Sequence, residues 1–102
     1  MKSQTKKGLI ELCALALLSK EDYYGYDISV IISNLINIAD GTIYPVLRKM
    51  KDEGLVTTYI TEGKGGPPRK YYKITITGTK EYIEEKKNWK ILADNIYGLL
   101  EN

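Results

Sequence analysis

Side chains used in catalysis are scarce in this chain, whereas lysine and arginine gather in a few short stretches. There is no histidine and only one cysteine, so neither a histidine-activated nucleophile nor a usual zinc site can be built. The glycine-rich tract 63–68 makes a poor phosphate loop, because Pro67 and Pro68 have no N–H to donate. We therefore expect no enzyme activity, no metal and no other cofactor.

Positive charge is unevenly distributed, although the net charge is only +2. Besides a basic segment at 48–51, there are two clusters: an N-terminal arm with Lys2, Lys6 and Lys7, and residues 63–73 with Lys64, Arg69, Lys70 and Lys73. Cations clustered in this way suit the phosphates of nucleic acid. For either cluster alone we favour a solvated tail or a solvated hairpin tip, so the elements that carry the clusters must decide.

The size and composition are those of one folded domain. The chain has 102 residues, of which 43% are apolar and 27% charged, and no apolar run reaches the ~18 residues of a membrane-spanning helix. Residues 9–18 resemble a short signal peptide, but Glu11 interrupts the run and no convincing cleavage site follows. Cys13 lies between apolar neighbours, which predicts a buried, inert thiol. We expect a cytoplasmic protein without a membrane partner.

The segment 40–54 predicts a helix with one apolar face and one basic face. Ile43, Leu47 and Met50 recur at helical spacing and should form a buried stripe. Gly54 is placed to end the helix, and Pro45 requires it to begin near Thr42, with Asp40 or Thr42 as the capping side chain.

The preceding and following segments predict a helix-turn-helix and a β-hairpin. Residues 4–19 form an apolar helix that should also meet another chain, and residues 20–24 look like a polar turn. A second helix follows, on which Ile28, Ile31, Ile32 and Leu35 make an apolar stripe. It lies a few residues before the basic helix, which is helix-turn-helix spacing. Strands at 56–61 and 70–76 flank the glycine-rich tract and predict a hairpin, the wing of a winged helix.

The last helix should begin at Thr77 or Thr79 and carries a near-heptad seam through Tyr82, Trp89, Leu92, Ile96 and Leu99, with Glu85 as a polar break. We favour a role between subunits over a helix that folds back on its own domain. The predicted fold is therefore α+β and mostly α, a winged helix-turn-helix of three helices and a hairpin (residues 1–76) with a C-terminal dimerisation helix (residues 77–102) in one compact unit.

Four motifs in this order resemble the PadR family of bacterial transcriptional regulators, in particular its short subclass. They are residues 24–28 (YGYDI), 41–47 (GTIYPVL), 53–56 (EGLV) and 65–75 (GGPPRKYYKIT) followed by Gly78. The resemblance implies a homodimeric repressor whose C-terminal helix packs against the other protomer and its first helix. It would bind double-stranded DNA at a pseudo-palindromic promoter site, with two basic helices in successive major grooves ~34 Å apart.

We expect two sets of functional residues. The DNA-binding set is Lys6, Lys7, Tyr24, Thr42, Tyr44, Pro45, Arg48, Lys49, Lys64, Arg69 and Lys70. The set at the dimer interface or an effector site is Leu12, Leu15, Trp89, Leu92, Ile96 and Leu99. Arg48 could fork onto guanine, and the lysines suit phosphates.

Two alternatives stay open from the sequence. Trp89 either binds a small aromatic or lipophilic effector that releases the repressor, as in some PadR-like proteins that it resembles in pattern, or simply fills the dimer interface. The alternative function is a winged-helix interaction module that holds an acidic protein partner on its basic face.

Overall fold

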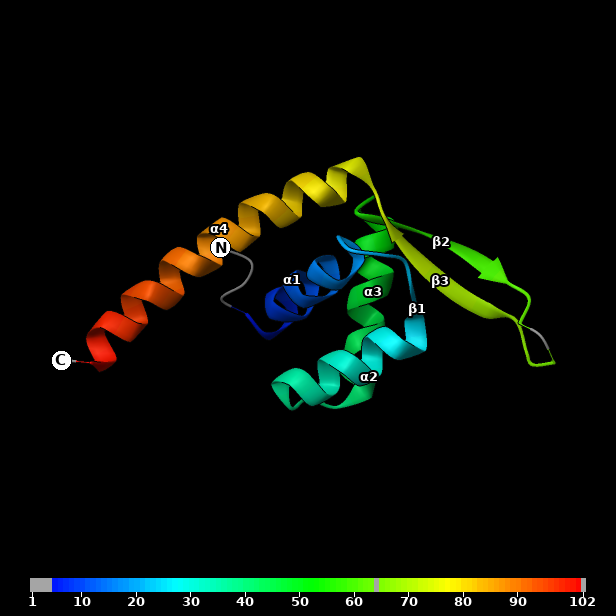
Figure 1. Cartoon of the computed structure of the whole chain (residues 1–102), viewed down its shortest axis with the longest axis horizontal. Coiled ribbons are helices and arrows are strands. Elements are labelled where there is room, and N and C mark those ends of the chain that lie inside the picture. The colour runs from blue at the N-terminus through cyan, green and yellow to red at the C-terminus, as the bar shows by residue number, and fades with distance from the viewer. Residues whose placement is uncertain (1–4, 64, 102) are drawn as a thin grey trace.

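The computed structural model describes residues 5–63 and 65–101, and its helices surround one end of a small sheet (Figure 1). The elements in chain order are α1 (Lys6–Leu18), β1 (Tyr23–Tyr24), α2 (Gly25–Ile36), the 3-10 turn η2 (Asp40–Thr42), α3 (Ile43–Asp52), β2 (Val56–Thr61), β3 (Arg69–Ile74) and α4 (Ile76–Leu100). The predicted α+β fold, a winged helix-turn-helix followed by a long C-terminal helix, is confirmed.

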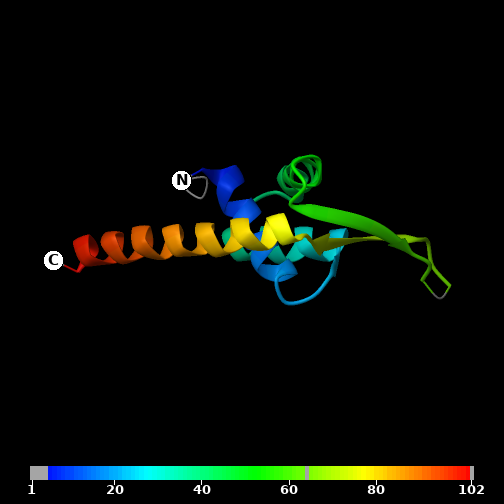
Figure 2. The same ribbon diagram turned by 90° about the horizontal axis from the view of Figure 1, so that it is seen from above.

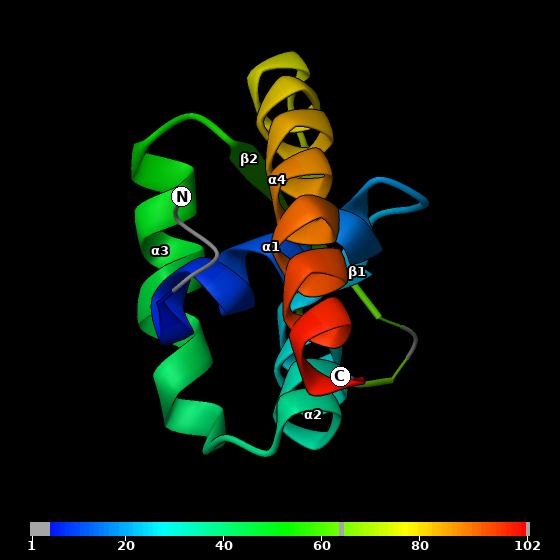
Figure 3. The same cartoon turned by 90° about the vertical axis from the view of Figure 1, so that its left-hand side faces the viewer.

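The core forms where α1, α2 and α3 meet. α1 lies between α3 and α4, which explains its many apolar positions (Figure 3). Side chains that are fully buried include Ile10 and Leu15 of α1, Ile28 and Ile32 of α2, and Ile43, Leu47 and Met50 of α3. The apolar stripe of α2 is only half covered, because Ile31 and Leu35 are exposed.

The sheet has three antiparallel strands in the order β1-β3-β2. Residues 20–24 were predicted to be a turn, but Tyr23 and Tyr24 pair with Tyr72 and Tyr71 of β3. A strand of two residues is too short to show an alternating pattern, so pairing with β3 decides it. Beyond β1, the β2–β3 hairpin projects away from the helices as the predicted wing (Figure 2).

Both ends of α3 show how the helix-turn-helix is built. Neither Asp40 nor Thr42 caps it with a side chain, so that prediction was wrong: η2 leads straight into α3, and the Thr42 amide bonds to the Ala39 carbonyl at 3.0 Å. At the other end Gly54 has φ +77°, and the amides of Gly54 and Leu55 donate back to Lys51 and Met50. This is a Schellman ending, which favours glycine at the left-handed residue.

α4 begins at Ile76, because the side chain of Thr75 caps it by accepting a hydrogen bond from the Gly78 amide at 2.9 Å. The prediction of Thr77 or Thr79 as the cap was wrong. Both residues lie inside the first turns. The first half of α4 lies against the domain, and its second half extends past it, so that the molecule is 56 Å long (Figures 1 and 2).

Among the described residues, no single helix is long and apolar enough to cross a membrane. α2 and the η2–α3 segment reach the required length and hydropathy only together, across a bend of 114°.

Candidate nucleic-acid interface

α3 presents a ridge of polar and basic side chains on the side opposite its buried stripe. Ile43, Val46, Leu47 and Met50 face the core, whereas Tyr44, Pro45, Arg48, Lys49 and Lys51 are exposed. The spacing of apolar residues at 43, 46, 47 and 50 leaves the intervening positions free to face solvent. The ridge therefore offers hydrogen-bond donors and positive charge to whatever lies along α3.

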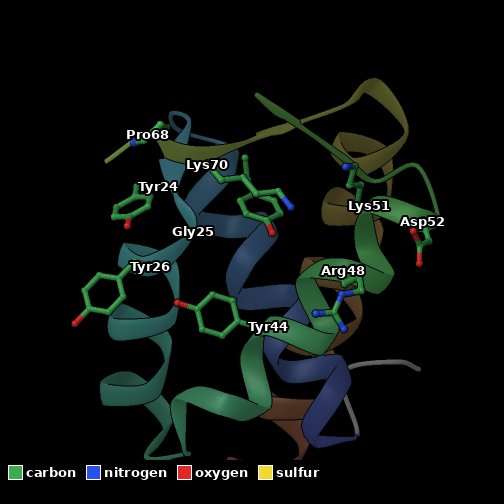
Figure 4. Close-up of a pocket in the computed structure, with 10 residues that line it drawn as sticks. Tyr24, Gly25, Tyr26, Tyr44, Arg48, Lys51, Asp52, Pro68 and Lys70 are labelled. Carbon is green, nitrogen blue, oxygen red and sulfur yellow. The ribbon is translucent and has the colours of Figure 1, made fainter. Parts of the chain in front are cut away.

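A hollow of about 540 Å³ separates this ridge from the wing. Figure 4 shows Tyr24, Tyr26 and Tyr44 on one side, Arg48, Lys51 and Asp52 on the other, and Lys70 of β3 reaching between them; these residues line the hollow together with Gly25, Pro68 and Tyr72. Cations from α3 and β3 and tyrosines from β1, α2, α3 and β3 thus line one hollow, as a surface that contacts phosphates requires.

Two side-chain contacts position residues that line this hollow. The Tyr44 hydroxyl lies 3.3 Å from the hydroxyl of Ser29, which joins α3 to α2. The Lys70 ammonium lies 5.8 Å from the centre of the Tyr72 ring. Burial raises the pKa of Tyr72, while the nearby positive charge of Arg48 acts in the opposite direction. Arg48 of α3 and Tyr72 of β3 thus line the same hollow.

A second hollow, of about 530 Å³, flanks the same ridge on the side of α1. Lys7 of α1 lines it together with Thr42, Pro45 and Lys49 from the start and ridge of α3. The N-terminal end of α1 and α3 lie on the same side of the molecule in Figure 3. The structure thus brings most of the predicted DNA-binding residues together around α3, in two groups on either side of the ridge.

Comparisons with known proteins agree with this geometry. The family model described as "Transcriptional regulator PadR-like family" matches residues 14–84. The chain belongs to the PadR-like family of transcriptional regulators. This assignment confirms the family that the motifs indicated.

Solved structures place the chain among close structural relatives. It is 34% identical to a PadR-like transcriptional regulator from Bacillus cereus, with a TM-score of 0.84 over 98% of this chain and 99% of that one. A Streptococcus mutans protein is 40% identical, with a TM-score of 0.84, covering 92% and 88% of the two chains. PadR of Bacillus subtilis, solved in complex with operator DNA, is 29% identical with a TM-score of 0.66, covering 74% of this chain and 45% of that one.

Of the predicted site residues Tyr24, Arg69 and Lys6 of this PadR-like chain, only Tyr24 lines one of the two hollows. Tyr24 is half-buried, with its ring 6.0 Å from those of Tyr26 and Tyr71, and the Arg69 guanidinium sits over it at 4.9 Å from the ring centre. Tyr24 is therefore held largely by packing, and Arg69 is exposed above it. Lys6 is exposed at the start of α1, and Lys64 lies outside the described residues.

Sequence reasoning left two residues out of the site. Lys51 lines the first hollow one turn beyond Leu47; it belongs to the basic segment 48–51 but was not among the predicted site residues. Tyr26 is 54% exposed on the first turn of α2 and lines the same hollow. Tyr24 lies in β1 and is half-buried, so Tyr26 is the more exposed of the two tyrosines, a difference that the sequence alone does not show.

The residues predicted for a dimer interface or effector site behave differently from one another. Leu15 is 0% exposed in the protomer's own core, so it has no surface for a partner, and its assignment was wrong. Leu12 and Leu92 are half-buried, and Trp89, Ile96 and Leu99 are 39%, 46% and 75% exposed. The seam on α4 thus becomes more exposed towards its end, and its role stays a prediction.

Proposed function

We propose that this PadR-like regulator binds double-stranded DNA as a homodimer and represses transcription from a pseudo-palindromic promoter site. The observation that carries the proposal is the exposed α3 ridge with a hollow on each side. Arg48, Lys51 and Lys70 line the hollow on the wing side, and Lys7 and Lys49 line the hollow on the α1 side beside two glutamates. A helix exposed in this way can enter a major groove, while basic side chains from flanking elements contact the phosphates. The operator complex of the related Bacillus subtilis protein supports this proposal.

Base readout is assigned to Arg48 and phosphate contact to Lys70. Arg48 is exposed on the ridge one turn after Tyr44, and its guanidinium suits the paired acceptors of guanine. Lys70 lies on the wing side of the hollow and suits a phosphate, which fixes register without reading sequence.

The test uses a labelled fragment from upstream of the protein's own gene, located by footprinting and followed by fluorescence anisotropy at increasing salt. Affinity should fall steeply with salt, because each neutralised phosphate releases counterions. Lys70→Ala should weaken binding to all sequences and lower the salt slope by about 1. Arg48→Ala should cost about 1–3 kcal/mol at one base position and relax preference there.

Lys90→Ala is the matched control, because Lys90 lies on α4, where it bonds to Asp94 at 2.8 Å. It removes the same charge and should change the salt slope little. An affinity that does not respond to salt would refute the DNA-binding proposal. Equal losses on every sequence for Arg48→Ala would refute only base readout by Arg48.

The homodimer is inferred from the exposed apolar side chains along α4. Ile83, Ile91, Leu99 and Leu100 are between 53% and 75% exposed, which is a large unpartnered surface for one helix. Ile96→Glu should convert the dimer to a monomer in sedimentation experiments and weaken binding to the full operator. A wild-type protein that sediments as a monomer at high concentration would contradict this part of the proposal.

An effector that stacks on Trp89 is proposed as the means of release. Trp89 is the only tryptophan and is 39% exposed on the seam of α4, so its fluorescence reports that site alone. Planar aromatic dyes should quench or shift its emission and lower operator affinity at the same concentrations. Unchanged emission across several such dyes would leave Trp89 with a packing role only.

A further inference from the structure

Thr75 ties the end of α3 to the start of α4. Its hydroxyl oxygen lies 2.7 Å from the Gly54 carbonyl and 3.0 Å from the Leu55 carbonyl, so its one proton is shared between them. The same oxygen accepts the Gly78 amide and caps α4, and the Thr75 amide donates to the Leu55 carbonyl at 3.1 Å. One residue therefore bonds to both helix ends.

Gly78 brings the first turn of α4 into close contact with this corner. A Cβ atom placed on Gly78 would overlap the Leu55 carbonyl and would lie 2.8 Å from Cγ1 of Ile74. Only glycine lets the helix backbone approach so closely. The contact leaves α4 little room to move relative to Leu55.

Leu55 also closes α3. Its amide donates to the Met50 carbonyl at 2.9 Å in the Schellman ending, and its side chain is buried at 5% exposure. The end of the ridge helix and the start of the long C-terminal helix thus share Leu55. We call Gly54, Leu55, Thr75 and Gly78 together the α3–α4 joint.

We propose that the α3–α4 joint fixes the orientation of α3 relative to α4 and thereby sets the half-site spacing that the dimer accepts on DNA. This inference rests on the proposed function. If two protomers associate through α4, the angle between α3 and α4 in each one determines how far apart the two α3 helices lie. Adding one base pair moves a half-site by about 3.4 Å and turns it by about 35°, which a rigid joint cannot follow. Thr75 is then a positioning residue for DNA recognition, although it lies at the base of the wing and not on the α3 ridge.

The experiment uses the full-length dimer and the footprinted inverted repeat. Four duplexes are compared by anisotropy: the native spacing, spacings one base pair shorter and longer, and a single half-site. The wild type should bind the native spacing about tenfold or more tightly than the altered spacings. This difference in affinity is as large as that caused by one mismatched base pair. Thr75→Val and Thr75→Asp should reduce this preference to about threefold or less while their affinity for the single half-site stays unchanged.

Three variants separate the joint from simple loss of the helix cap. The Asp variant still accepts the Gly78 amide and caps α4, but an ionised carboxylate has no proton to give to Gly54 and Leu55. Thr75→Ser keeps both functions and should retain the wild-type spacing preference. Thr79→Val is the matched control, because the Thr79 hydroxyl donates to the carbonyl of the cap residue Thr75, at 3.0 Å, and among the described residues not to Gly54 or Leu55.

Each outcome either supports or overturns the proposed role of the α3–α4 joint. Spacing preference lost in the Val and Asp variants, and kept in the Ser variant and in Thr79→Val, supports the joint. Wild-type preference in Thr75→Asp, or an equal loss of affinity on all four duplexes, overturns it. A wild type that binds the repeat without any spacing preference also overturns it but leaves the proposed function standing, whereas a wild type that binds none of the duplexes overturns both.

Discussion

Replacing Gly54 by alanine should destabilise the protein, because Gly54 holds the left-handed conformation that ends α3. Its φ is +77°, and no atom lies within 4 Å of the position where a Cβ would be, so the cost is one of backbone conformation and not of space. Left-handed backbone costs an L-residue about 1–2 kcal/mol. The stiffer unfolded chain returns about 0.4–1 kcal/mol of this, which leaves a net loss of about 1 kcal/mol.

Gly41→Ala is the matched control. Gly41 also has no atom within 4 Å of an added Cβ, but its φ lies outside the left-handed region. This variant should be neutral or slightly stabilising, because alanine lowers only the entropy of the unfolded chain.

The assay is thermal and urea unfolding of both variants and the wild type at one protein concentration, since association shifts apparent stability. A loss of 1 kcal/mol corresponds to a fall in Tm of about 4–8 °C for a domain of this size. If Gly54→Ala were as stable as Gly41→Ala, the Schellman ending of α3 would not contribute as the geometry indicates. A loss far above 2 kcal/mol would point to rearrangement of the α3–α4 joint instead of local strain.

Three further predictions concern buried or half-buried titratable groups. Glu85 is 9% exposed, and its Oε2 has no hydrogen-bond partner among the described residues. Glu85→Leu should therefore raise the free energy of unfolding by about 1–3 kcal/mol, with Glu84→Leu on the exposed face as the control. A lower free energy of unfolding would mean that the carboxylate has a partner in the dimer. Burial raises the pKa of Tyr72, so the folded state holds its proton more tightly, and the resulting stability, complete below the ordinary value of about 10, is lost as pH rises through the folded pKa. Unfolding measured from pH 9 to 12 should therefore show a steeper loss in the wild type than in Tyr72→Phe, and parallel curves would contradict it. Burial also raises the pKa of the Cys13 thiol, so alkylation at pH 8 should be slow in the native protein and fast in urea; similar rates would show that α1 opens readily.

The sequence alone predicted the elements that are specified locally. Apolar spacing at Ile43, Leu47 and Met50 and the glycine at position 54 define α3 through contacts within one helix and its ending, and both are observed. The hairpin followed from β-branched and aromatic runs around a glycine-rich turn. A chain with no histidine and one cysteine has few side chains for nucleophilic catalysis or zinc binding, whatever fold it adopts.

Tertiary structure decided what depends on residues far apart in the chain. Tyr23 and Tyr24 form a strand only because β3 lies beside them. Leu15 is not available to an interface because it is fully buried in the protomer's own core. The sequence placed basic residues near the hairpin and near α3, but only the fold shows that Lys70 and Arg48 share one hollow while Arg69 stacks on Tyr24. The residue that caps α4 also depends on tertiary contacts. Thr75, and not one of the threonines after it, is the cap, because Thr75 follows β3 and lies at the end of α3. There its hydroxyl donates to the carbonyls of Gly54 and Leu55. Periodicity describes one element at a time, and such contacts exist only once the elements are packed.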